Sequence, residues 1–346
     1  MKKLFLLAVS VALFAACSEK AQINESPEIP IDFTKSYVEK GTKALYTTSN
    51  FAATGNTMGV FGWKKNSSTY TKIFDDQEVN YNEDAANDWG YKPKKYWDRN
   101  ADNYIFYAYA PHSDDFTGTV TAPTQTSATS FAINDFIQAT VVADQIDLLV
   151  DLTSQINNTN NKSTDTPKPE VSFTFSHILS QVNFVMSVSS TLKGDETDNP
   201  VEVQSVTLKN VNTKGTYSYN SGWKWSSQAT PVNFSATTKA SGDKTVVFAS
   251  KELGTTAANI PGLKEMLLIP GSVSSYTVTV NFTIGTEPYE RTINLTDFKS
   301  NNTSLSEWAI GNNYIYHLTI GPDPIEFASP TINDWATGGT YSYNID

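Results

Sequence analysis

Residues 276–295 read YTVTVNFTIGTEPYERTINL and contain the clearest structural pattern in the chain. From Tyr276 to Ile284 apolar residues occupy every second position, with threonine or asparagine between them. Successive side chains of a strand point to opposite faces of a sheet, so this pattern predicts a strand with one buried face. A similar alternation from Tyr289 to Leu295 indicates a second strand.

The alternation extends over most of the chain. Helical periodicity is nearly absent, although Ser304 to Trp308 allows one capped helical turn. An aromatic content of 12% and a charged content of 18% are typical of strands and turns. The sequence therefore predicts an all-β fold of antiparallel β-sandwiches. Further strands are expected at 29–33, 146–152, 171–175, 182–188 and 314–320.

A polar stretch separates two groups of predicted strands. Residues 157–169 have almost no apolar side chain to bury, which indicates an inter-domain linker or a long exposed loop. The 346 residues are enough for two domains. We therefore expect an N-terminal β-sandwich over residues 44–160 and a C-terminal one over residues 161–346, in tandem.

One predicted strand of the first half is apolar on both faces, so we expect both faces to be covered. A tryptophan-rich stretch, residues 89–97, precedes it. Such a stretch can bind sugar rings, but packing inside the protein is the favoured interpretation. The strand places Tyr104, Phe106 and Ala108 on one face and Ile105, Tyr107 and Tyr109 on the other.

Residues 1–16 have the features of a signal peptide. Lys2-Lys3 form a positive region, residues 4–14 are apolar, and Ala15-Ala16 supply small residues for cleavage. The apolar run is shorter than the ~20 residues that a membrane-spanning helix needs. We therefore expect an export signal and not an anchor.

The only cysteine, Cys17, follows directly. The stretch Leu13-Phe14-Ala15-Ala16-Cys17 resembles a bacterial lipobox, in which the sulfur carries the lipid and the cysteine becomes the new N-terminus. The alternative is an ordinary signal peptide with an unrelated cysteine nearby. The lipobox interpretation predicts an exported protein that is held on a membrane through Cys17, since two or more acyl chains give stable attachment.

Several function classes are disfavoured by composition and spacing. A net charge of −11 argues against nucleic-acid binding, which needs a basic surface. His112, His177 and His317 are far apart and lack metal-ligand spacing. Catalytic patterns such as His-Glu-x-x-His and Gly-x-Ser-x-Gly are absent from the sequence. We therefore expect no enzyme activity, no metal and no cofactor.

A set of short motifs distributed along the chain resembles the fimbrillins of Bacteroidales, the Mfa-like and FimA-like lipoprotein-precursor subunits of the type V pilus. The lipobox and Thr42-Lys43-Ala44, where the family often has Thr-Arg-Ala, contribute to this resemblance. The other motifs are Gly59-Val60-Phe61, Trp89-Gly90-Tyr91-Lys92-Pro93, Lys95-Tyr96-Trp97, Tyr107-Ala108-Tyr109-Ala110-Pro111, Phe175-Ser176-His177, Leu268-Ile269-Pro270, Trp308-Ala309-Ile310-Gly311-Asn312 and Ile332-Asn333-Asp334-Trp335.

The resemblance implies two transthyretin-like β-sandwich domains and assembly by donor-strand exchange. It implies that residues 17–43 form a lipidated tether with a removable strand, and that a protease cuts between Lys43 and Ala44. A strictly arginine-specific protease would not cut after this lysine. The removable strand would present Ile29, Ile31 and Phe33, and the donor strand would present Tyr341, Tyr343 and Ile345.

The resemblance also implies partners and a location. Other fimbrial subunits are the expected partners, together with the membrane through the lipid on Cys17 and a host or bacterial surface ligand. The expected location is the outer membrane and the cell-surface fimbrium. The tail from Thr340 to Asp346 could instead pair within its own sheet.

Two alternatives stay open on the sequence. One is a surface glycan-binding lipoprotein, with Trp223, Trp225 or Trp308 as stacking platforms. Trp223 and Trp225 lie on the same side of a predicted strand, where they could equally be paired aromatics of a hairpin. The other alternative is a pilus anchor or tip subunit that does not polymerise.

Overall fold

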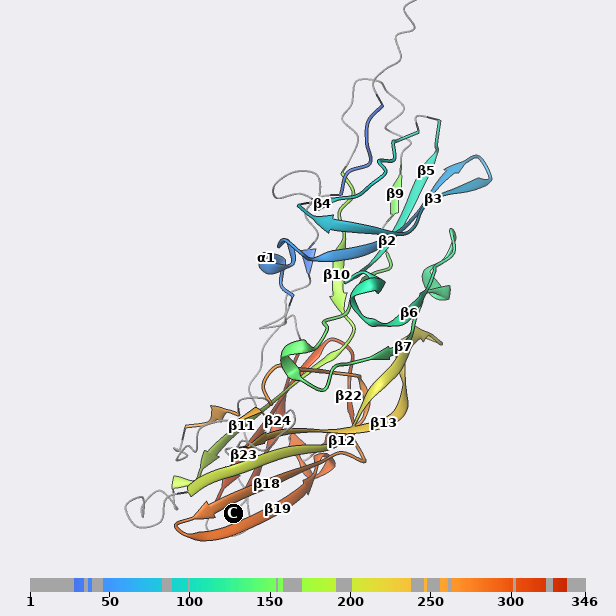
Figure 1. Cartoon of the computed structure of the whole chain (residues 1–346). Helices are drawn as coiled ribbons and strands as arrows, with labels where there is room; N and C mark the ends of the chain where they lie inside the picture. The colour runs from blue at the N-terminus through green and yellow to red at the C-terminus, as the bar shows by residue number, and fades with distance from the viewer. Residues whose placement is uncertain are drawn as a thin grey trace, which may run out of the picture.

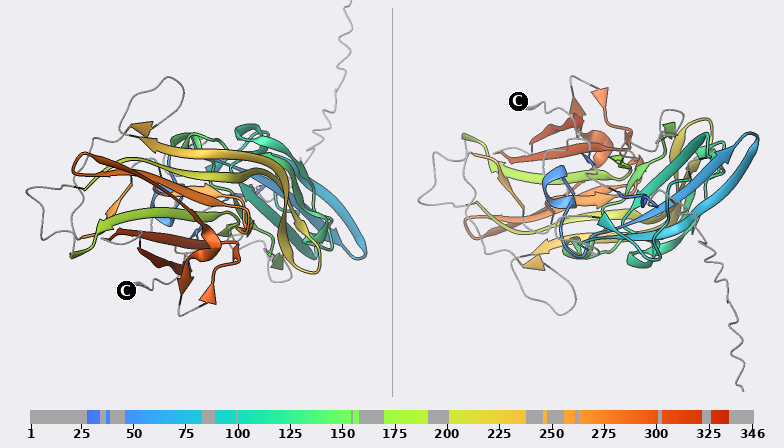
Figure 2. Two further views of the ribbon diagram at one scale, coloured as in Figure 1. Left: turned by 90° about the horizontal axis from the view of Figure 1, so that it is seen from below. Right: turned by 90° about the horizontal axis from the view of Figure 1, so that it is seen from above.

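The computed structural model describes thirteen ranges of the chain, and almost all of the regular elements within them are strands. This confirms the all-β prediction. Strands from the first half gather at one end of an elongated molecule and most strands from the second half at the other (Figure 1). The two views in Figure 2 keep these groups apart. The described residues are 28–33, 37–38, 46–82, 89–98, 100–153, 155–157, 170–190, 201–237, 246–247, 256–260, 263–300, 303–321 and 326–334.

The first sheet has eight strands in the order β1-β10-β8-β5-β2-β3-β4, with β9 paired to β5. Its pairings are antiparallel except for β1 beside β10, which is parallel. The strands are β1 (Tyr37–Val38), β2 (Thr57–Asn66), β3 (Thr69–Tyr81), β4 (Trp89–Gly90), β5 (Asn103–Ala110), β8 (Leu149–Asp151), β9 (Gln155–Asn157) and β10 (Thr174–His177).

Two further large sheets make up most of the rest of the described chain. A seven-stranded sheet runs β14-β13-β12-β18-β19; β7 also pairs with β12, and β6 pairs with β7. A five-stranded sheet runs β15-β11-β23-β24, with β16 paired to β11. Their strands are β6 (Thr117–Thr121), β7 (Ala132–Ile137), β11 (Ser180–Val188), β12 (Val201–Tyr219), β13 (Trp223–Thr237), β14 (Val246–Val247), β15 (Ala258–Asn259), β16 (Met266–Leu268), β18 (Thr277–Ile284), β19 (Glu287–Asn294), β23 (Asn312–Ile320) and β24 (Glu326–Asp334).

Short elements complete the described residues. The one α-helix, α1, is a single turn, and no helix in the described ranges is long and apolar enough to cross a membrane. Residues 304–308, where the sequence allowed a helical turn, instead contribute to β21 and β22, because Trp308 pairs with Gly271 of β17. These elements are α1 (Thr48–Phe51), η1 (Ser113–Asp115), η2 (Ala128–Ser130), η3 (Val142–Asp144), η5 (Leu295–Asp297), β17 (Gly271–Ser272), β20 (Lys299–Ser300), β21 (Thr303–Ser304) and β22 (Glu307–Trp308).

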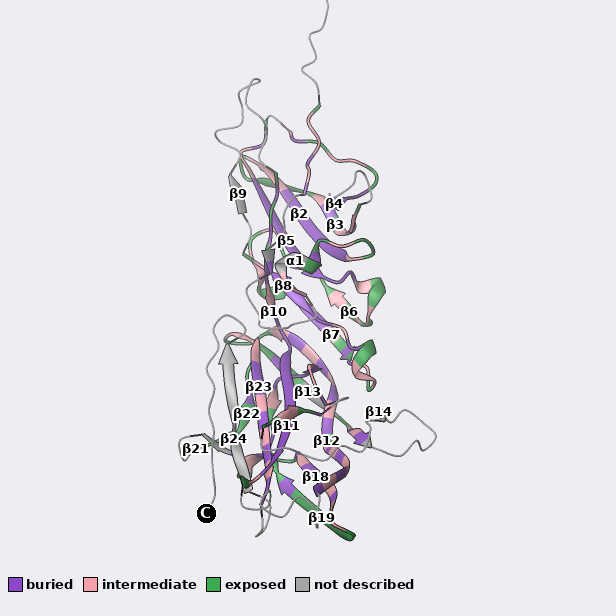
Figure 3. Cartoon of the chain, turned by 90° about the vertical axis from the view of Figure 1, so that its left-hand side faces the viewer, coloured by how far each residue is buried: buried purple, intermediate pink, exposed green. Residues whose placement is uncertain are grey.

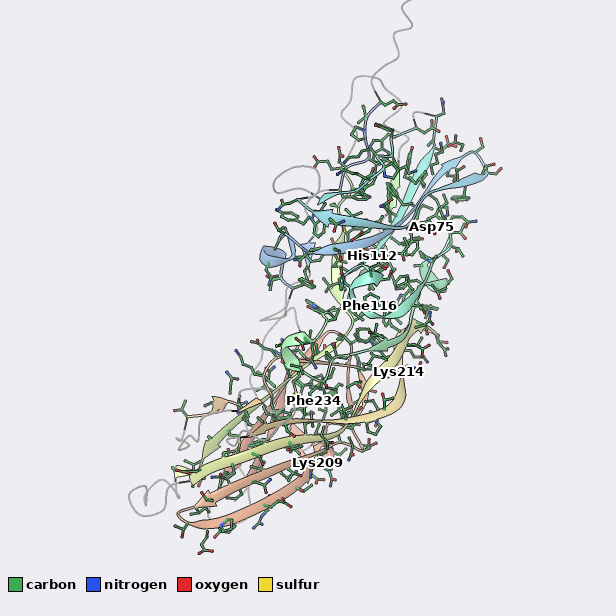
Figure 4. The ribbon with its side chains drawn as sticks, in the orientation of Figure 1. Asp75, His112, Phe116, Lys209, Lys214 and Phe234 are labelled. Atoms are coloured by element: carbon green, nitrogen blue, oxygen red, sulfur yellow. The ribbon has the colours of Figure 1, made fainter. Side chains whose placement is uncertain are left out.

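The long strand β12 belongs to both ends of the molecule. Lys209, in its first half, lies opposite Thr277 of β18, whereas Lys214 lies opposite Ile137 of β7. Figure 4 labels both lysines and shows them well separated along the strand. Between them the pairing of β12 with β13 shifts register twice. The strand therefore links the C-terminal sheets to the layer beside the first sheet.

The buried apolar side chains form three clusters. The N-terminal core contains Val60, Phe106 and Phe173 among others. The middle core lies on the opposite face of the first sheet and includes Tyr107 and Phe136. The C-terminal core fills the space between the five- and seven-stranded sheets and includes Leu208, Val280 and Leu318. Figure 3 shows β2 and β5 as largely buried and the edge strand β19 as largely exposed.

Strand β5 confirms the expectation that an apolar strand is covered on both faces. Tyr104, Phe106 and Ala108 belong to the N-terminal core. The residues between them belong to the middle core. The tryptophans of residues 89–97 are buried as well, which confirms packing as their role: Trp89 is 3% exposed and Trp97 is 6% exposed.

The division of the chain at residue 160 stays a prediction. Strands from both sides of this position share sheets, because β10 pairs with β8 and β7 pairs with β12. Residues 158–169, which contain most of the polar stretch, lie outside the described ranges, and the description resumes at residue 170.

Candidate functional site

The N-terminal segment, residues 28–33, is inserted between two stretches that are distant in sequence. On one side Ile31 N–H donates to Lys95 O at 2.9 Å, and Trp97 N–H donates to Ile29 O at 3.0 Å. On the other side Val171 N–H donates to Asp32 O at 2.9 Å. We call the space between residues 89–97 and residues 171–175 the strand slot. The N-terminal segment fills it in the manner of a strand.

The segment runs antiparallel to one wall and parallel to the other. Phe33 forms an antiparallel bridge with Trp89 and a parallel bridge with Val171. Further along, Val38 of β1 lies beside Phe175 of β10, also in parallel. Both walls therefore present backbone groups to the same inserted chain, which is the geometry of an added strand.

The apolar side chains of the segment fill the N-terminal core. Ile31 and Phe33 are 0% exposed, and Ile29 is partly buried. Burying such a side chain contributes about 1.5–3 kcal/mol. Four rings surround the ring of Phe33 and form what we call the aromatic pocket, with centroid distances of 5.5 Å to Phe74, 5.4 Å to Tyr91, 6.3 Å to Phe106 and 5.9 Å to Phe173.

Polar side chains around the slot also contact the segment. The Tyr91 hydroxyl donates to Ile31 O at 2.7 Å and accepts from Lys95 N–H at 3.3 Å. Lys94 Nζ lies 3.4 Å from Asp32 Oδ1 and 4.9 Å from the centre of the Tyr91 ring. The ion pair is partly exposed to solvent, so we expect it to contribute little to stability. Tyr91 is buried and makes the stronger contact.

The chain is anchored again shortly after the segment. Tyr46 N–H donates to Asp147 Oδ2 at 3.1 Å, and Asp147 Oδ1 lies 2.9 Å from His177 Nδ1. The side chains of Asp147 and His177 are 0% and 1% exposed. Burial, and then the charge of Asp147, raises the pKa of Tyr46 to about 12. Tyr46 is therefore held by a buried carboxylate and packs against the N-terminal core.

The predicted site residues divide into two groups. Ile29, Ile31 and Phe33 are brought together in the strand slot. The predicted lipidation residue, the processing pair and the donor residues lie outside the described ranges, and their roles stay predictions. These residues are Cys17, Lys43, Ala44, Tyr341, Tyr343 and Ile345.

The three tryptophans considered as sugar platforms pack against other residues of the protein. Trp225 is 9% exposed, and its indole N–H donates to Ile178 O at 2.6 Å. Trp308 is 1% exposed and donates to the Tyr316 hydroxyl at 2.8 Å. Trp223 is half-buried and stacks on Tyr217 of the same hairpin, at 5.4 Å. These contacts favour the paired-aromatics interpretation over a sugar-binding surface.

Two of the three histidines, His112 and His177, lie beside carboxylates. His112 Nε2 lies 3.8 Å from Asp76 Oδ1, and its Nδ1 lies 3.6 Å from Asp114 Oδ2. His317 lies on β23, and burial lowers its pKa. The described ranges contain no cluster of three or more histidine, cysteine or acidic residues arranged to hold a metal ion.

Several residues of the slot were not identified from the sequence. Tyr91 was noted only as part of a motif, and Phe173 only as one member of an alternating strand. Their contact with Phe33 joins three distant parts of the chain. Contacts between residues so far apart in sequence cannot be predicted from a local pattern. The apolar alternation at residues 29–33 is such a local pattern, and it predicted the inserted segment.

The comparisons with known proteins agree with this architecture. The family model described as fimbrillin-like matches residues 42–335. Fimbrium subunit Fim1C of Phocaeicola vulgatus is 27% identical over 194 residues, which is 52% of this chain and 50% of that protein. The chain thus matches about half the length of this curated relative.

Solved structures are similar over most of the chain. A fimbrial protein from Bacteroides vulgatus has a TM-score of 0.53 at 18% identity, covering 88% of this chain and 99% of that one. A putative cell adhesion protein from Bacteroides uniformis has a TM-score of 0.49 at 18% identity, covering 89% and 98%.

The sheets and the strand slot define an all-β protein whose N-terminal segment completes its fold. The match over residues 42–335 is more specific: the chain belongs to the fimbrillin-like family, a family of fimbrial structural proteins.

Proposed function

We propose that this protein is a structural subunit of a cell-surface fimbria that polymerises by donor-strand exchange. In this proposal the chain is exported as a lipoprotein through Cys17, and a protease cuts between Lys43 and Ala44. The N-terminal segment then leaves the strand slot. The tail of a second subunit, with Tyr341, Tyr343 and Ile345, enters in its place.

The observation that carries the proposal is the insertion of residues 28–33 between residues 89–97 and 171–175. Departure of this segment would uncover Lys95 O, Trp97 N–H and Val171 N–H, together with the rings of the aromatic pocket. Unpaired strand edges with apolar side chains associate with other strands. A new strand would regain backbone bonds at about 1 kcal/mol each, besides the apolar burial.

The cut position fits the anchor that follows it. The proposed bond, Lys43–Ala44, precedes Tyr46, whose N–H is held by the buried Asp147. The part that leaves would therefore end before the part that stays fixed. Fimbrium subunit Fim1C is by its name a component of a fimbrium, which supports other fimbrial subunits as partners. A membrane contact through the lipid and an outer-membrane origin follow from the same proposal.

The test is controlled proteolysis of the purified precursor. We expect trypsin to leave a core that begins at Ala44 and forms ladders on non-boiled gels. Replacing Lys35, Lys40 and Lys43 together by glutamine should block both the cut and the ladders, because trypsin also cuts after Lys35 and Lys40. A chain truncated before Thr340 should be cut normally but form no ladders.

Two results would contradict parts of this proposal. Ladders that persist without the tail would exclude it as the donor strand. N-terminal sequencing of the surface-extracted protein gives the second control. A monomer that still begins at a lipidated Cys17 would exclude polymerisation and favour a non-polymerising pilus anchor.

A further inference from the structure

We propose that the aromatic pocket and the Tyr91 hydroxyl act together as a specificity pocket, which selects an incoming strand that carries an aromatic side chain. The occupant is the tail of a second copy of this chain, which has Tyr341 and Tyr343 on its apolar face. This inference rests on the proposed strand exchange and adds to it the chemistry by which the slot would recognise its partner.

The geometry of the pocket fits a planar ring. Phe173 stacks on Phe33 with an interplanar angle of 22°, whereas Phe106 meets it edge-on at 89° and Tyr91 at 63°. Stacked and edge-on contacts both depend on a flat aromatic partner. An aliphatic side chain would leave part of this space empty, and empty space in a packed core is destabilising.

The pocket is built from residues that would stay after the segment departs. Phe74 lies on β3 and Phe106 on β5, and both pack over Gly62 of β2. A Cβ on Gly62 would lie 2.8 Å from Phe74 Cδ2 and 2.9 Å from Phe106 Cδ1. The missing side chain at Gly62 therefore makes room for these two rings.

Tyr91 connects side-chain recognition with backbone recognition. Its ring forms one wall of the pocket, and its hydroxyl donates to Ile31 O, two residues before the pocketed Phe33. Every extended strand offers a carbonyl at that spacing, because the side chains of alternate residues share a face and their carbonyls point to the same edge. A bound strand is therefore held through both its carbonyl and its aromatic side chain, in a fixed register.

The experiment adds a fluorescent peptide during cleavage of the full exported chain. A peptide with the sequence of residues 336–346 should enter vacated slots, label the ladders and shorten them. Peptides with Tyr341→Phe and Tyr343→Phe should bind within about twofold of the original, since the ring is kept. Replacing both tyrosines by leucine should weaken incorporation at least about tenfold. Single leucine peptides then identify which tyrosine enters the pocket.

A protein variant tests the hydroxyl. Tyr91→Phe should reduce incorporation of the peptide several-fold, because it removes the donor to the strand carbonyl. Tyr96→Phe is the matched control, since Tyr96 lies in the same wall but its side chain is 46% exposed. If Tyr91→Phe fails to fold, the peptide series alone decides.

The outcomes separate this inference from the proposed function. If the original peptide enters the cleaved chain and the double-leucine peptide enters equally well, the pocket does not select aromatic side chains and the inference is wrong. If cleavage yields neither ladders nor peptide incorporation, the proposed strand exchange itself fails.

Discussion

At the scale of single residues, Gly59 packs directly against the ring of Tyr109 in the first sheet. The two residues lie opposite each other on β2 and β5. A Cβ on Gly59 would lie 2.3 Å from Tyr109 Cε1, which is far inside contact distance. The Tyr109 hydroxyl donates to Asp76 Oδ1 at 2.6 Å and accepts from Ser113 N–H at 3.1 Å, so the ring is held in place.

This packing predicts that Gly59→Ala destabilises the protein by about 1–3 kcal/mol, the range for an overfilled core. The ring of Tyr109 has to move, and its bond to Asp76 is strained or lost. Thermal or urea unfolding measures the effect.

A double variant is the control for this prediction. Tyr109→Leu removes the ring that Gly59→Ala would meet, so the second substitution should be much less harmful in that background. Equal effects of Gly59→Ala with and without the ring would contradict the steric explanation.

The same pair explains two motifs of the sequence. Gly59-Val60-Phe61 and Tyr107-Ala108-Tyr109 face each other residue by residue across β2 and β5. The sequence predicted the strand that contains Tyr107-Ala108-Tyr109 and gave Gly59-Val60-Phe61 only as a motif, and it contains no local signal that the two stretches are neighbours. The requirement for glycine at position 59 appears only once Tyr109 is placed beside it.

At the scale of elements, β12 is the strand on which the two ends of the molecule depend. Lys214 pairs with Gln228 of β13 on one side and with Ile137 of β7 on the other. Its side chain forms an ion pair with Asp135 at 3.0 Å, with 27% and 60% of the two side chains exposed. The backbone of Lys214 should therefore matter more than its charge.

We predict that Lys214→Pro destabilises the protein by about 3 kcal/mol or more, because proline removes a backbone donor from a strand with neighbours on both sides. Lys214→Ala keeps the N–H and loses only an exposed ion pair, so its effect should stay below about 1 kcal/mol. Comparable losses from the two variants would show that the side chain, and not strand continuity, is the important feature.

Prediction from the sequence was strong for elements and weak for their partners. Strands β11, β18, β19 and β23 lie where alternation indicated them, and β5 lies where a run apolar on both faces indicated it. The assignment of β10 to the first sheet could not be read, because its partners β8 and β1 come from other parts of the chain. The extent of β12 was also missed, since no alternation was identified over residues 201–219.

At the scale of the whole molecule, each of the three cores contains or contacts a tyrosine whose pKa is raised by burial, so the stability of the protein should depend on alkaline pH. Burial raises the pKa of Tyr46 and of Tyr104 to about 12, from an ordinary value of 10.0. Burial also raises the pKa of Tyr109, in the middle core, and of Tyr316, in the C-terminal core.

These shifts predict alkaline unfolding. The unfolded chain loses tyrosine protons near pH 10 while the folded chain keeps them, so the contribution to stability is complete below about pH 10 and is lost as the pH rises through about 12. The melting temperature should fall over this interval. Tyrosinate absorbance should rise later in the folded protein than in urea-unfolded protein, and coincident titration curves would contradict the assignment.

The position of the N-terminal segment has a consequence for how the chain reaches its native state. Residues 95–97 and residue 171 each bond to residues 28–33, which lie between them. A polypeptide synthesised without residues 28–33 would have to fold residues 89–97 and 171–175 into place without the strand that bonds to both. We therefore expect a chain that starts at Ala44 to refold in lower yield than the full precursor, which would mean that the N-terminal segment guides folding before the proposed cleavage removes it.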